Sequence, residues 1–390
     1  MKTEFSCVRD GLTIRGTEYR RETCLEGSDC YPAAVICHGF GGNQYDLVFY
    51  AEKLADMGYA VYCFDFCGGC VVGKSDGDSL DMTIDTEAAD LKAVLDYVKK
   101  RPYVDVKHMV LIGGSQGGYV AGVVAAERPE DIDKLILFYP ALCIPEAART
   151  GTLGGACYDI NHVPEVIDTF GVRISRKFHD NVVDKDANEQ IRGYKGPVLL
   201  IHGSEDMIVN NQYAVQADKA YENCHLQILE GAGHGFTPEQ RNEVIVSVLE
   251  FLKGHKEILC IRVNITGSEE KRDGKETIRF IYFGGSCENE YFKGTILPGA
   301  VDEQHFLGED MISICAVYEL EGRDCSGQDC HIKIINREIG GSFKPQIQTD
   351  SPELDFLNDC DLTAALEGFE GGLTVRIFAD WENTKTKARG

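Results

Sequence analysis

The sequence predicts two successive folds: an α/β fold built on a doubly wound, mostly parallel sheet, and then a smaller all-β domain. Three observations lead to this prediction. Up to about residue 254, short apolar runs alternate with amphipathic segments, as strands and helices do around a parallel sheet. After that point only short β-like runs follow, separated by glycines and acidic turns. The length of 390 residues also exceeds the usual size of a single hydrophobic core.

The elements of the first part follow one another in a regular order. An antiparallel pair turned at Asp10-Gly11 comes first, because two β-like arms flank a turn dipeptide. Short apolar runs then predict buried strands, and amphipathic segments that end at Gly58 or before Pro102 predict helices. We expect strands at residues 4–9, 13–20, 33–37, 59–64, 109–112, 134–138, 198–201 and 225–229, and helices at 45–57, 83–100, 119–127 and 238–253.

A long insertion, from about 141 to 195, separates two of these strands. Its prolines and its glycine-rich stretch at 151–155 make it a poor candidate for one regular element. A long insertion over the carboxyl ends of strands is more often a lid than an unstructured loop. We therefore expect a lid, carried by an α/β domain that spans residues 1–254.

The all-β domain is expected to span residues 256–390 and to form a small barrel-like or sandwich module. Its predicted strands lie at residues 258–265, 277–283, 291–296, 311–319, 330–338 and 373–378. We expect this module to serve in packing or in forming a homo-oligomer. A ligand-binding or carbohydrate-binding module is the alternative.

The charge and the cysteines limit the classes of partner and compartment. A net charge of −24, spread over both parts of the chain, argues against nucleic acid and anionic membranes as partners. No secretory signal and no run near the roughly 18 apolar residues of a membrane span is visible. The sixteen cysteines then predict a cytoplasmic protein with reduced thiols. Cys63, Cys67 and Cys70 lack the paired second half of a zinc site, so no metal is expected.

The segment Gly113–Gly118 carries the strongest chemical signal. It lies between an apolar run and a helix, which is the context of a nucleophile elbow with Ser115 at its tip. Gly113 and Gly117 flank Ser115 at two residues, where a strained turn leaves no room for side chains. The helix that follows directs its free N–H groups toward a forming oxyanion. The alternative is an ordinary glycine-rich turn.

A serine nucleophile needs a base, and the base needs an acid that orients it. Asp206 and His234 follow the last two predicted strands of the sheet, in the order serine, acid, histidine that accompanies such an elbow. All three groups lie beyond the carboxyl ends of parallel strands, where open α/β sheets place their sites. Glu205 is the alternative acid, and we expect His202 to be structural.

Two N–H groups are needed to hold the oxyanion. Gln116, the residue after the nucleophile, supplies one of them. The other is expected from the loop at 38–43, whose glycines let the backbone turn inward, with Phe40 as the donor. A tight turn around a buried His38 fits the same residues.

From about residue 5 to residue 252 the chain resembles the α/β hydrolases, and in particular the bacterial cinnamoyl or feruloyl esterase group. The motifs that carry the resemblance lie at residues 38–43, 64–66, 73–77, 113–118, 144–149, 202–206 and 233–236. The resemblance implies that Ser115 is the nucleophile, His234 the base and Asp206 its orienting acid. It also implies that Phe40 and Gln116 donate to the oxyanion and that the insertion forms the acyl pocket.

The insertion departs from that group in its polar residues. Members that hold a hydroxylated cinnamoyl ring use an acid and an amide, and the matching stretches here read Glu146-Ala147 and Leu153-Gly154. Glu146 stands in for the acid, and the amide is absent. Tyr158, His162 or His179 would supply a replacement contact.

The β-rich tail resembles, more weakly, an uncharacterised bacterial barrel family. This resemblance rests on residues 283–286, 292–300 and 373–378 and implies no activity.

Together these residues predict a serine carboxylesterase that needs no cofactor and takes a small-molecule ester, with feruloyl or chlorogenate-type esters as the narrower class. A serine peptidase or acyltransferase of the same fold is one alternative. A non-catalytic binding protein is another, but the intact set of Ser115, Asp206 and His234 argues against it.

Overall fold

The computed structural model describes residues 1–23, 30–169 and 171–380. The chain divides into two compact units, Met1–Ile245 and Val246–Gly390. This division falls inside the helix Pro238–Leu252, whereas the expected boundary lies just after that helix. Each unit has a hydrophobic core of its own.

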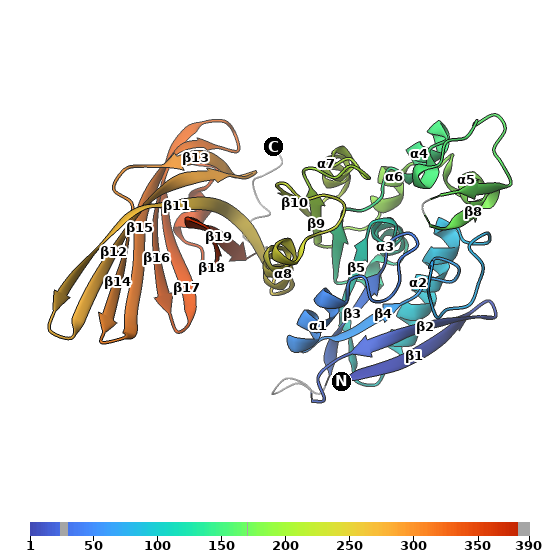
Figure 1. Cartoon of the computed structure of the whole chain (residues 1–390), viewed down its shortest axis with the longest axis horizontal. Coiled ribbons are helices and arrows are strands. Elements are labelled where there is room, and N and C mark those ends of the chain that lie inside the picture. Colours follow the sequence, from blue (N-terminus) through green and yellow to red (C-terminus); the bar gives the residue numbers. More distant parts are fainter. Residues whose placement is uncertain (24–29, 170, 381–390) are drawn as a thin grey trace. The chain divides into compact units, whose positions relative to one another are not determined.

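Within the described residues, the N-terminal unit is built around an eight-stranded sheet (Figure 1). In spatial order its strands are β1 (Lys2–Arg9), β2 (Leu12–Tyr19), β4 (Ala60–Phe64), β3 (Tyr31–Cys37), β5 (Val104–Gly114), β6 (Lys134–Phe138), β9 (Val198–Gly203) and β10 (Cys224–Leu229). β2 is antiparallel to both of its neighbours, and all other neighbours are parallel. The mostly parallel sheet predicted from the alternation of strands and helices is therefore present.

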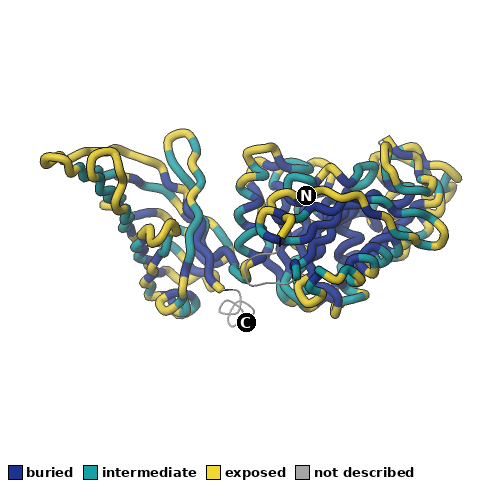
Figure 2. The backbone as a smooth tube through the Cα atoms, turned by 90° about the horizontal axis from the view of Figure 1, so that it is seen from below, coloured by how far each residue is buried: buried dark blue, intermediate teal, exposed yellow. Residues whose placement is uncertain are grey.

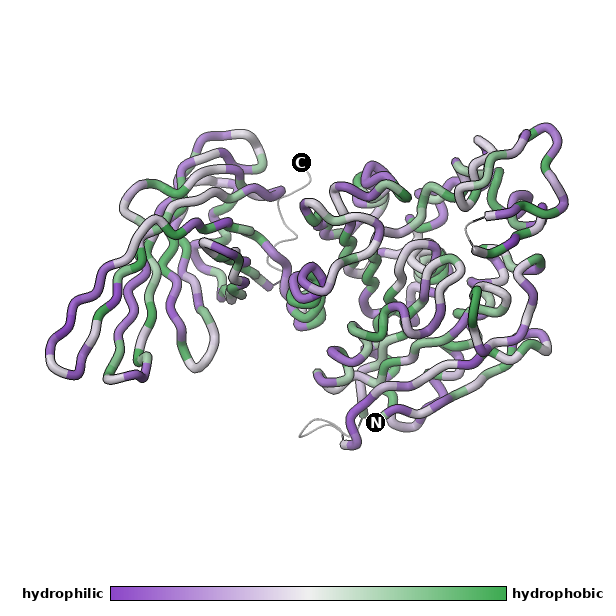
Figure 3. Tube along the Cα trace, viewed as in Figure 1, coloured by the Kyte–Doolittle hydropathy of each residue, from purple (hydrophilic) through white to green (hydrophobic). Residues whose placement is uncertain are grey.

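The central strands of this sheet are apolar on both faces, because helices cover a parallel sheet from both sides. β3 buries nearly all of its residues, and β4 buries every one. Figures 2 and 3 show a buried, hydrophobic centre in this unit, with exposed and hydrophilic residues toward its loops. The carboxyl ends of the parallel strands meet at one edge, where loops bring polar side chains together.

Helices connect most of these strands. They are α1 (Val48–Asp56), α2 (Ile84–Lys99), α3 (Gln116–Glu127), α7 (Gln212–Ala220) and α8 (Pro238–Leu252), with a short 3₁₀ turn η1 (Pro129–Asp131) before β6. α2 begins at a capping box, in which the side chains of Thr83 and Thr86 each accept the backbone N–H of the other. α1 begins later than the expected residue 45, because residues 44–47 form turns.

The segment between β6 and β9 contains several short elements instead of one regular element. They are α4 (Ile144–Thr150), η2 (Leu153–Gly155), β7 (Val166–Asp168), β8 (Arg173–Ser175), α5 (Arg176–Val182) and α6 (Ala187–Ile191). Buried apolar side chains of this segment, such as Phe178 and Val182, join the main core. Asn181 also donates to Asp85 at the start of α2 over 2.7 Å. The insertion is therefore packed onto the sheet unit, and its action as a lid stays a prediction.

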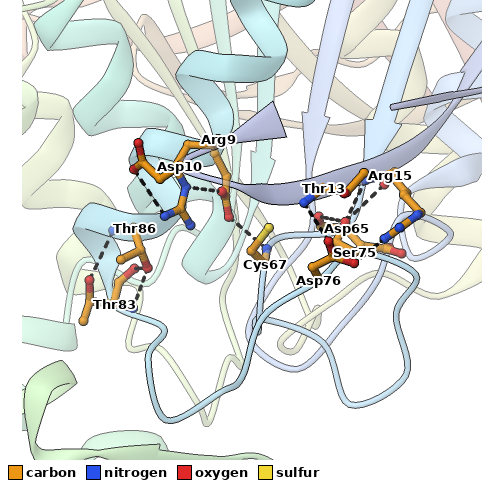
Figure 4. A network of polar contacts seen from close by, with 11 residues as sticks. Arg9, Asp10, Thr13, Arg15, Asp65, Cys67, Ser75, Asp76, Thr83 and Thr86 are labelled. Carbon is orange, nitrogen blue, oxygen red and sulfur yellow. Dashed lines mark hydrogen bonds and ion pairs between the residues drawn. The ribbon is translucent and has the colours of Figure 1, made fainter. Parts of the chain in front are cut away.

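Polar contacts fasten the first hairpin to the segment after β4 (Figure 4). Arg9 donates to one carboxylate oxygen of buried Asp90 over 2.8 Å, and the other oxygen accepts the N–H of Cys67. Arg15 pairs with Asp76 over 2.7 Å. The same segment forms an isolated bridge to the loop after β3. The contacts between the first hairpin and the segment after β4 thus help to position the loop after β3.

Within the described residues, the C-terminal unit contains a nine-stranded antiparallel sheet (Figure 1). Its strands are β11 (His255–Asp273), β12 (Glu276–Glu288), β13 (Phe292–Ile296), β14 (Val301–Leu307), β15 (Asp310–Asp324), β16 (Asp329–Ile339), β17 (Ser342–Thr349), β18 (Leu362–Phe369) and β19 (Gly372–Asp380), with a 3₁₀ turn η3 (Asp355–Asn358) before β18. β11 pairs with both β12 and β19, so the pairings form a closed circuit. The predicted all-β domain is present.

The cysteines that the structure describes are free thiols, and most are buried or half-buried. Burial suits an apolar thiol, which packs as a small hydrophobic side chain. Among the helices of the described ranges, none is long and apolar enough to cross a membrane.

Candidate active site

The serine of the glycine-rich motif lies at the tip of a sharp turn between β5 and α3. Ser115 has φ 53° and ψ −122°, a backbone conformation that residues other than glycine rarely adopt. The turn needs glycine, because a Cβ atom at Gly113 would lie 2.3 Å from the carbonyl oxygen of Gly117. A Cβ atom at Gly117 would lie 2.2 Å from the carbonyl oxygen of His38. This strained turn leaves Ser115 partly accessible at the carboxyl edge of the sheet.

Ser115, His234 and Asp206 form a continuous hydrogen-bonded series. The Nε2 atom of His234 lies 2.8 Å from Oγ of Ser115, and its Nδ1 atom lies 2.8 Å from Oδ2 of Asp206. Since a carboxylate only accepts, Nδ1 carries the proton and Nε2 is free to accept the serine proton. The three groups come from the loops after β5, β9 and β10, as the sequence predicts for their placement.

Asp206 is buried, and its carboxylate accepts several hydrogen bonds. Oδ1 accepts the N–H groups of Ile208 and Val209 over 2.9 and 2.8 Å. Burial alone raises the pKa of Asp206, but hydrogen bonds from His202, His234 and the Val209 N–H outweigh it and hold the pKa below its usual range. The carboxylate therefore stays ionised at neutral pH and stabilises a positive charge on His234.

His202 and Glu205, the two other polar candidates of this loop, take different positions. His202 is fully buried, and its Nε2 atom lies 2.8 Å from the carbonyl oxygen of Val209 and 3.2 Å from Oδ2 of Asp206. This position agrees with a structural role in holding the acid. Glu205 is exposed, so the carboxylate beside His234 is that of Asp206.

The loop after β3 packs directly against the serine. A Cβ atom built at Gly39 would lie 3.0 Å from Cβ of Ser115, so the backbone of Gly39, which precedes Phe40, lies close to the nucleophile. Gln116 is the first residue of α3, where a backbone N–H has no carbonyl of its own helix to bond. Donation by the N–H groups of Phe40 and Gln116 to an oxyanion stays a prediction.

Hydrogen bonds to the end of β4 hold this loop. Nδ1 of His38 donates to the carbonyl oxygen of Gly39 over 2.7 Å, and Nε2 accepts the N–H of Phe66 over 3.1 Å. Asp65 accepts the backbone and side-chain N–H groups of Gln44. His38, Asp65 and Cys70 offer ligand atoms within 4.8 Å of one another, a spacing compatible with a metal. The lone pair of His38 is already engaged, however, so the cluster is better described as a polar support for the loop.

Glu87 lies beneath the elbow, and the sequence interpretation did not include it. Its Oε2 atom accepts a hydrogen bond of 2.9 Å from the side chain of Gln116. Burial raises the pKa of Glu87 to about 8, because the surrounding core solvates a charge poorly. An acid on the apolar stripe of α2, three residues after Ile84, was the available signal.

Tyr139 is a second residue that the sequence interpretation did not include. It follows the end of β6 and has a positive φ of 38°. Its ring packs edge-on against His234 at 4.9 Å and against Phe236 at 5.0 Å. Tyr139 thus supports the ring of His234, and its place after a strand end was the signal that could have found it.

The expected substrate contacts of the insertion each bond to another residue. Glu146 is exposed and accepts a hydrogen bond from Tyr213 over 2.7 Å. The hydroxyl of Tyr158 lies 2.9 Å from Nδ1 of His179. His162 is exposed and bonds to a nearby aspartate. No hydrogen bond among the described residues links these side chains to Ser115, so their role as substrate contacts stays a prediction.

Comparison with known proteins places this geometry in context. The model of the family described as serine aminopeptidase, S33, matches residues 32–156. A structure of Est1E from Butyrivibrio proteoclasticus with ferulic acid bound is 29% identical, covers 64% of this chain and 98% of that chain, and has a TM-score of 0.59. The N-terminal unit has the α/β-hydrolase fold. The prediction of that fold is therefore confirmed.

The curated relatives support a hydrolase at low identity. The monoacylglycerol lipase ABHD6 of Homo sapiens is 24% identical over 260 residues, which cover 57% of this chain and 75% of that protein. The matched family segment contains Phe40 and Ser115 but ends before Asp206 and His234. The neighbours are thus esterase-like and lipase-like.

Proposed function

We propose that this protein is a serine carboxylesterase that hydrolyses small esters with Ser115 as its nucleophile. One observation carries the proposal: Oγ of Ser115, both ring nitrogens of His234 and Oδ2 of Asp206 are joined by two contacts of 2.8 Å. A serine hydroxyl is a weak nucleophile unless a positioned base takes its proton. The esterase-like and lipase-like neighbours support the same chemistry.

In the proposed reaction, His234 takes the hydroxyl proton of Ser115 through Nε2 while Oγ bonds to the ester carbonyl carbon. The N–H groups of Phe40 and Gln116 hold the resulting oxyanion. The intermediate collapses, the ester C–O bond breaks, and the proton on His234 passes to the leaving alcohol. Water then attacks the acyl-enzyme, again with His234 as base, and this step releases the acid and restores Ser115.

The narrower substrate class that we propose is hydroxycinnamoyl esters. The ferulic acid in the Est1E structure motivates this class. Within the insertion, Glu146 and Tyr158 are the side chains proposed to contact the acyl ring. Glu146 now accepts a hydrogen bond from the hydroxyl of Tyr213, and the hydroxyl of Tyr158 bonds to the imidazole of His179.

A panel of esters tests both levels of this proposal. Short-chain nitrophenyl esters report on esterase chemistry, and methyl ferulate and chlorogenate report on the acyl group. We expect turnover of the nitrophenyl esters that Ser115→Ala abolishes. Lack of turnover for every ester would contradict the proposal. Turnover of nitrophenyl esters without methyl ferulate would limit it to the broader class.

A serine aminopeptidase is the second candidate, because the matching family model carries that description. The same nucleophile would then act on an amide. Amino-acid nitroanilides separate the two candidates, since an esterase of this kind should turn them over far more slowly than the matching nitrophenyl esters.

A further inference from the structure

The all-β unit contains a cavity of about 160 Å³, and all the residues that line it belong to that unit. Most of the lining is made of Val, Ile, Leu and Phe side chains. Four polar residues interrupt it, and they are Asp302, Gln304, Tyr318 and Asn336. The cavity is therefore distinct from the site at Ser115.

Strand register places several of these side chains in one row. Ile281 of β12 pairs with Asp302 of β14, Asp302 with Ala316 of β15, and Ala316 with Asn336 of β16. Directly paired residues point to the same face of a sheet, so the small side chain of Ala316 leaves space between Asp302 and Asn336. Tyr318, two residues along β15, faces the same side.

Three polar atoms of this lining are buried and have no hydrogen-bond partner among the described residues. They are Oδ1 of Asp302, the hydroxyl oxygen of Tyr318 and Oδ1 of Asn336. Tyr318 is only 3% exposed and Asn336 only 4%. Buried polar atoms are nearly always paired, because leaving them unpaired is unfavourable. Three unpaired atoms around one cavity indicate a place where a bound ligand would supply the missing hydrogen-bond partners.

The chemistry of the lining limits the ligand. None of the described residues that line the cavity is Lys, Arg or His, so nothing there would balance a carboxylate or phosphate. Asp302 already accepts a hydrogen bond from Gln304 over 2.8 Å through its other oxygen. Burial raises the pKa of Asp302, because a charge in this lining is poorly solvated. A cavity of about 150 Å³ lined by apolar side chains holds one benzene ring.

We propose that this cavity binds an uncharged compound with one ring and one hydroxyl group, of the size of a substituted phenol. The ring fills the apolar part of the cavity. The hydroxyl group accepts a hydrogen bond from Tyr318 and donates one to Asn336 or Asp302. This site does not depend on the proposed esterase function.

Calorimetric titration of the full chain with three matched probes tests this site. The probes are 4-methylphenol, toluene, which lacks the hydroxyl, and 4-methylbenzoate, which is an anion. We expect 4-methylphenol to bind about 25- to 100-fold more tightly than toluene, because toluene lacks two neutral hydrogen bonds that are each worth about 5- to 10-fold. We expect no binding of 4-methylbenzoate. Equal or tighter binding of the anion, or no binding of 4-methylphenol, would overturn the proposal.

Two variants locate the binding. Ala316→Trp fills the cavity and should abolish binding of both neutral probes. Tyr318→Phe keeps the shape and should weaken 4-methylphenol about 5- to 10-fold while leaving toluene unchanged. Tyr282→Phe is the matched control, since Tyr282 lies on the opposite face of β12, bonds to Glu269 and is 39% exposed.

Ester hydrolysis should be the same in all three variants, which separates this cavity from the Ser115 site. If Ala316→Trp fails to fold, the Tyr318→Phe result decides. Unchanged 4-methylphenol affinity in Tyr318→Phe would refute the site.

Discussion

The triad at the sheet edge and the cavity of the all-β unit differ in whether their buried polar groups are paired. At the edge of the α/β sheet, the side chains of Ser115, His234 and Asp206 bond to one another. In the all-β unit, Tyr318 and Asn336 line a cavity, and the hydroxyl of Tyr318 and Oδ1 of Asn336 have no hydrogen-bond partner in the described part of the chain. A site that moves protons needs its groups aligned before the substrate arrives. A site that only binds can leave its hydrogen-bonding groups for the ligand.

Two buried aspartates show the same difference. Asp206 accepts hydrogen bonds from backbone and imidazole donors, and these lower its pKa despite burial. Asp302 has one side-chain donor, Gln304, and burial raises its pKa. The number of donors around a buried carboxyl, and not its burial alone, decides the direction in which its pKa shifts. Substitutions in both units test this contrast.

The largest effect is expected for Ser115→Ala. Loss of the nucleophile should lower kcat for nitrophenyl esters by roughly 10⁶-fold, with the fold retained. Steady-state kinetics and circular dichroism check this. Ser313→Ala, an exposed serine of β15, is the control and should keep full activity. Activity within tenfold of the parent in Ser115→Ala would remove the serine from the mechanism.

Asp206→Asn should lower kcat by roughly 10⁴-fold, because an amide no longer holds the required tautomer of His234 or its positive charge. Glu205→Gln changes the exposed neighbouring acid and should have little effect. Comparison of the two variants under the same assay identifies the acid. An equal decrease of kcat in both variants would show that any substitution in this loop disturbs the site, and Asp206 would not be identified as the acid.

Glu87→Gln should change the pH dependence of stability. The folded-state pKa of about 8 lies above the ordinary value of 4.5. The contribution of this group to the free energy of unfolding is therefore fully present below pH 4.5 and is lost as the pH rises through 8. Between pH 5.5 and 8.5 the parent should lose about 3 kcal/mol of unfolding free energy from this group. Urea unfolding at both pH values should show a smaller loss in Glu87→Gln. Exposed Glu130→Gln should behave as the parent does.

The smallest effect contrasts two buried tyrosines. Tyr194, in the α/β unit, donates to the carbonyl oxygens of Ile132 and Asp133, so Tyr194→Phe should cost about 1–2 kcal/mol. Within residues 1–23, 30–169 and 171–380 the hydroxyl of Tyr318 has no hydrogen-bond partner, so Tyr318→Phe should leave the ligand-free protein unchanged or up to about 1 kcal/mol more stable. Urea unfolding measures both. If Tyr318→Phe lowered the free energy of unfolding as much as Tyr194→Phe does, the two hydroxyls would not differ in their pairing.

Local pattern was enough to predict most of the α/β unit. The elbow at Ser115 and the loops that carry Asp206 and His234 follow buried strands, and an apolar run marks each strand. The strands of the all-β unit were harder to predict from local pattern. β14 has no apolar run, β17 contains Pro345, and β18 has the Ala, Leu and Glu composition of a helix, so these strands escaped prediction. Pairing with neighbouring strands overrides such local preferences.

The sequence by itself therefore determined the order of the main elements of the α/β unit, the fold class and the three residues that meet at the sheet edge. Each depends on short-range patterns, namely periodicity, turn residues and the place of a polar residue after a strand. Only the tertiary structure decided that Glu87 lies under Gln116 and that Asp302 and Asn336 flank Ala316. Such contacts depend on strand register and on helix packing between distant segments, which local sequence patterns do not encode.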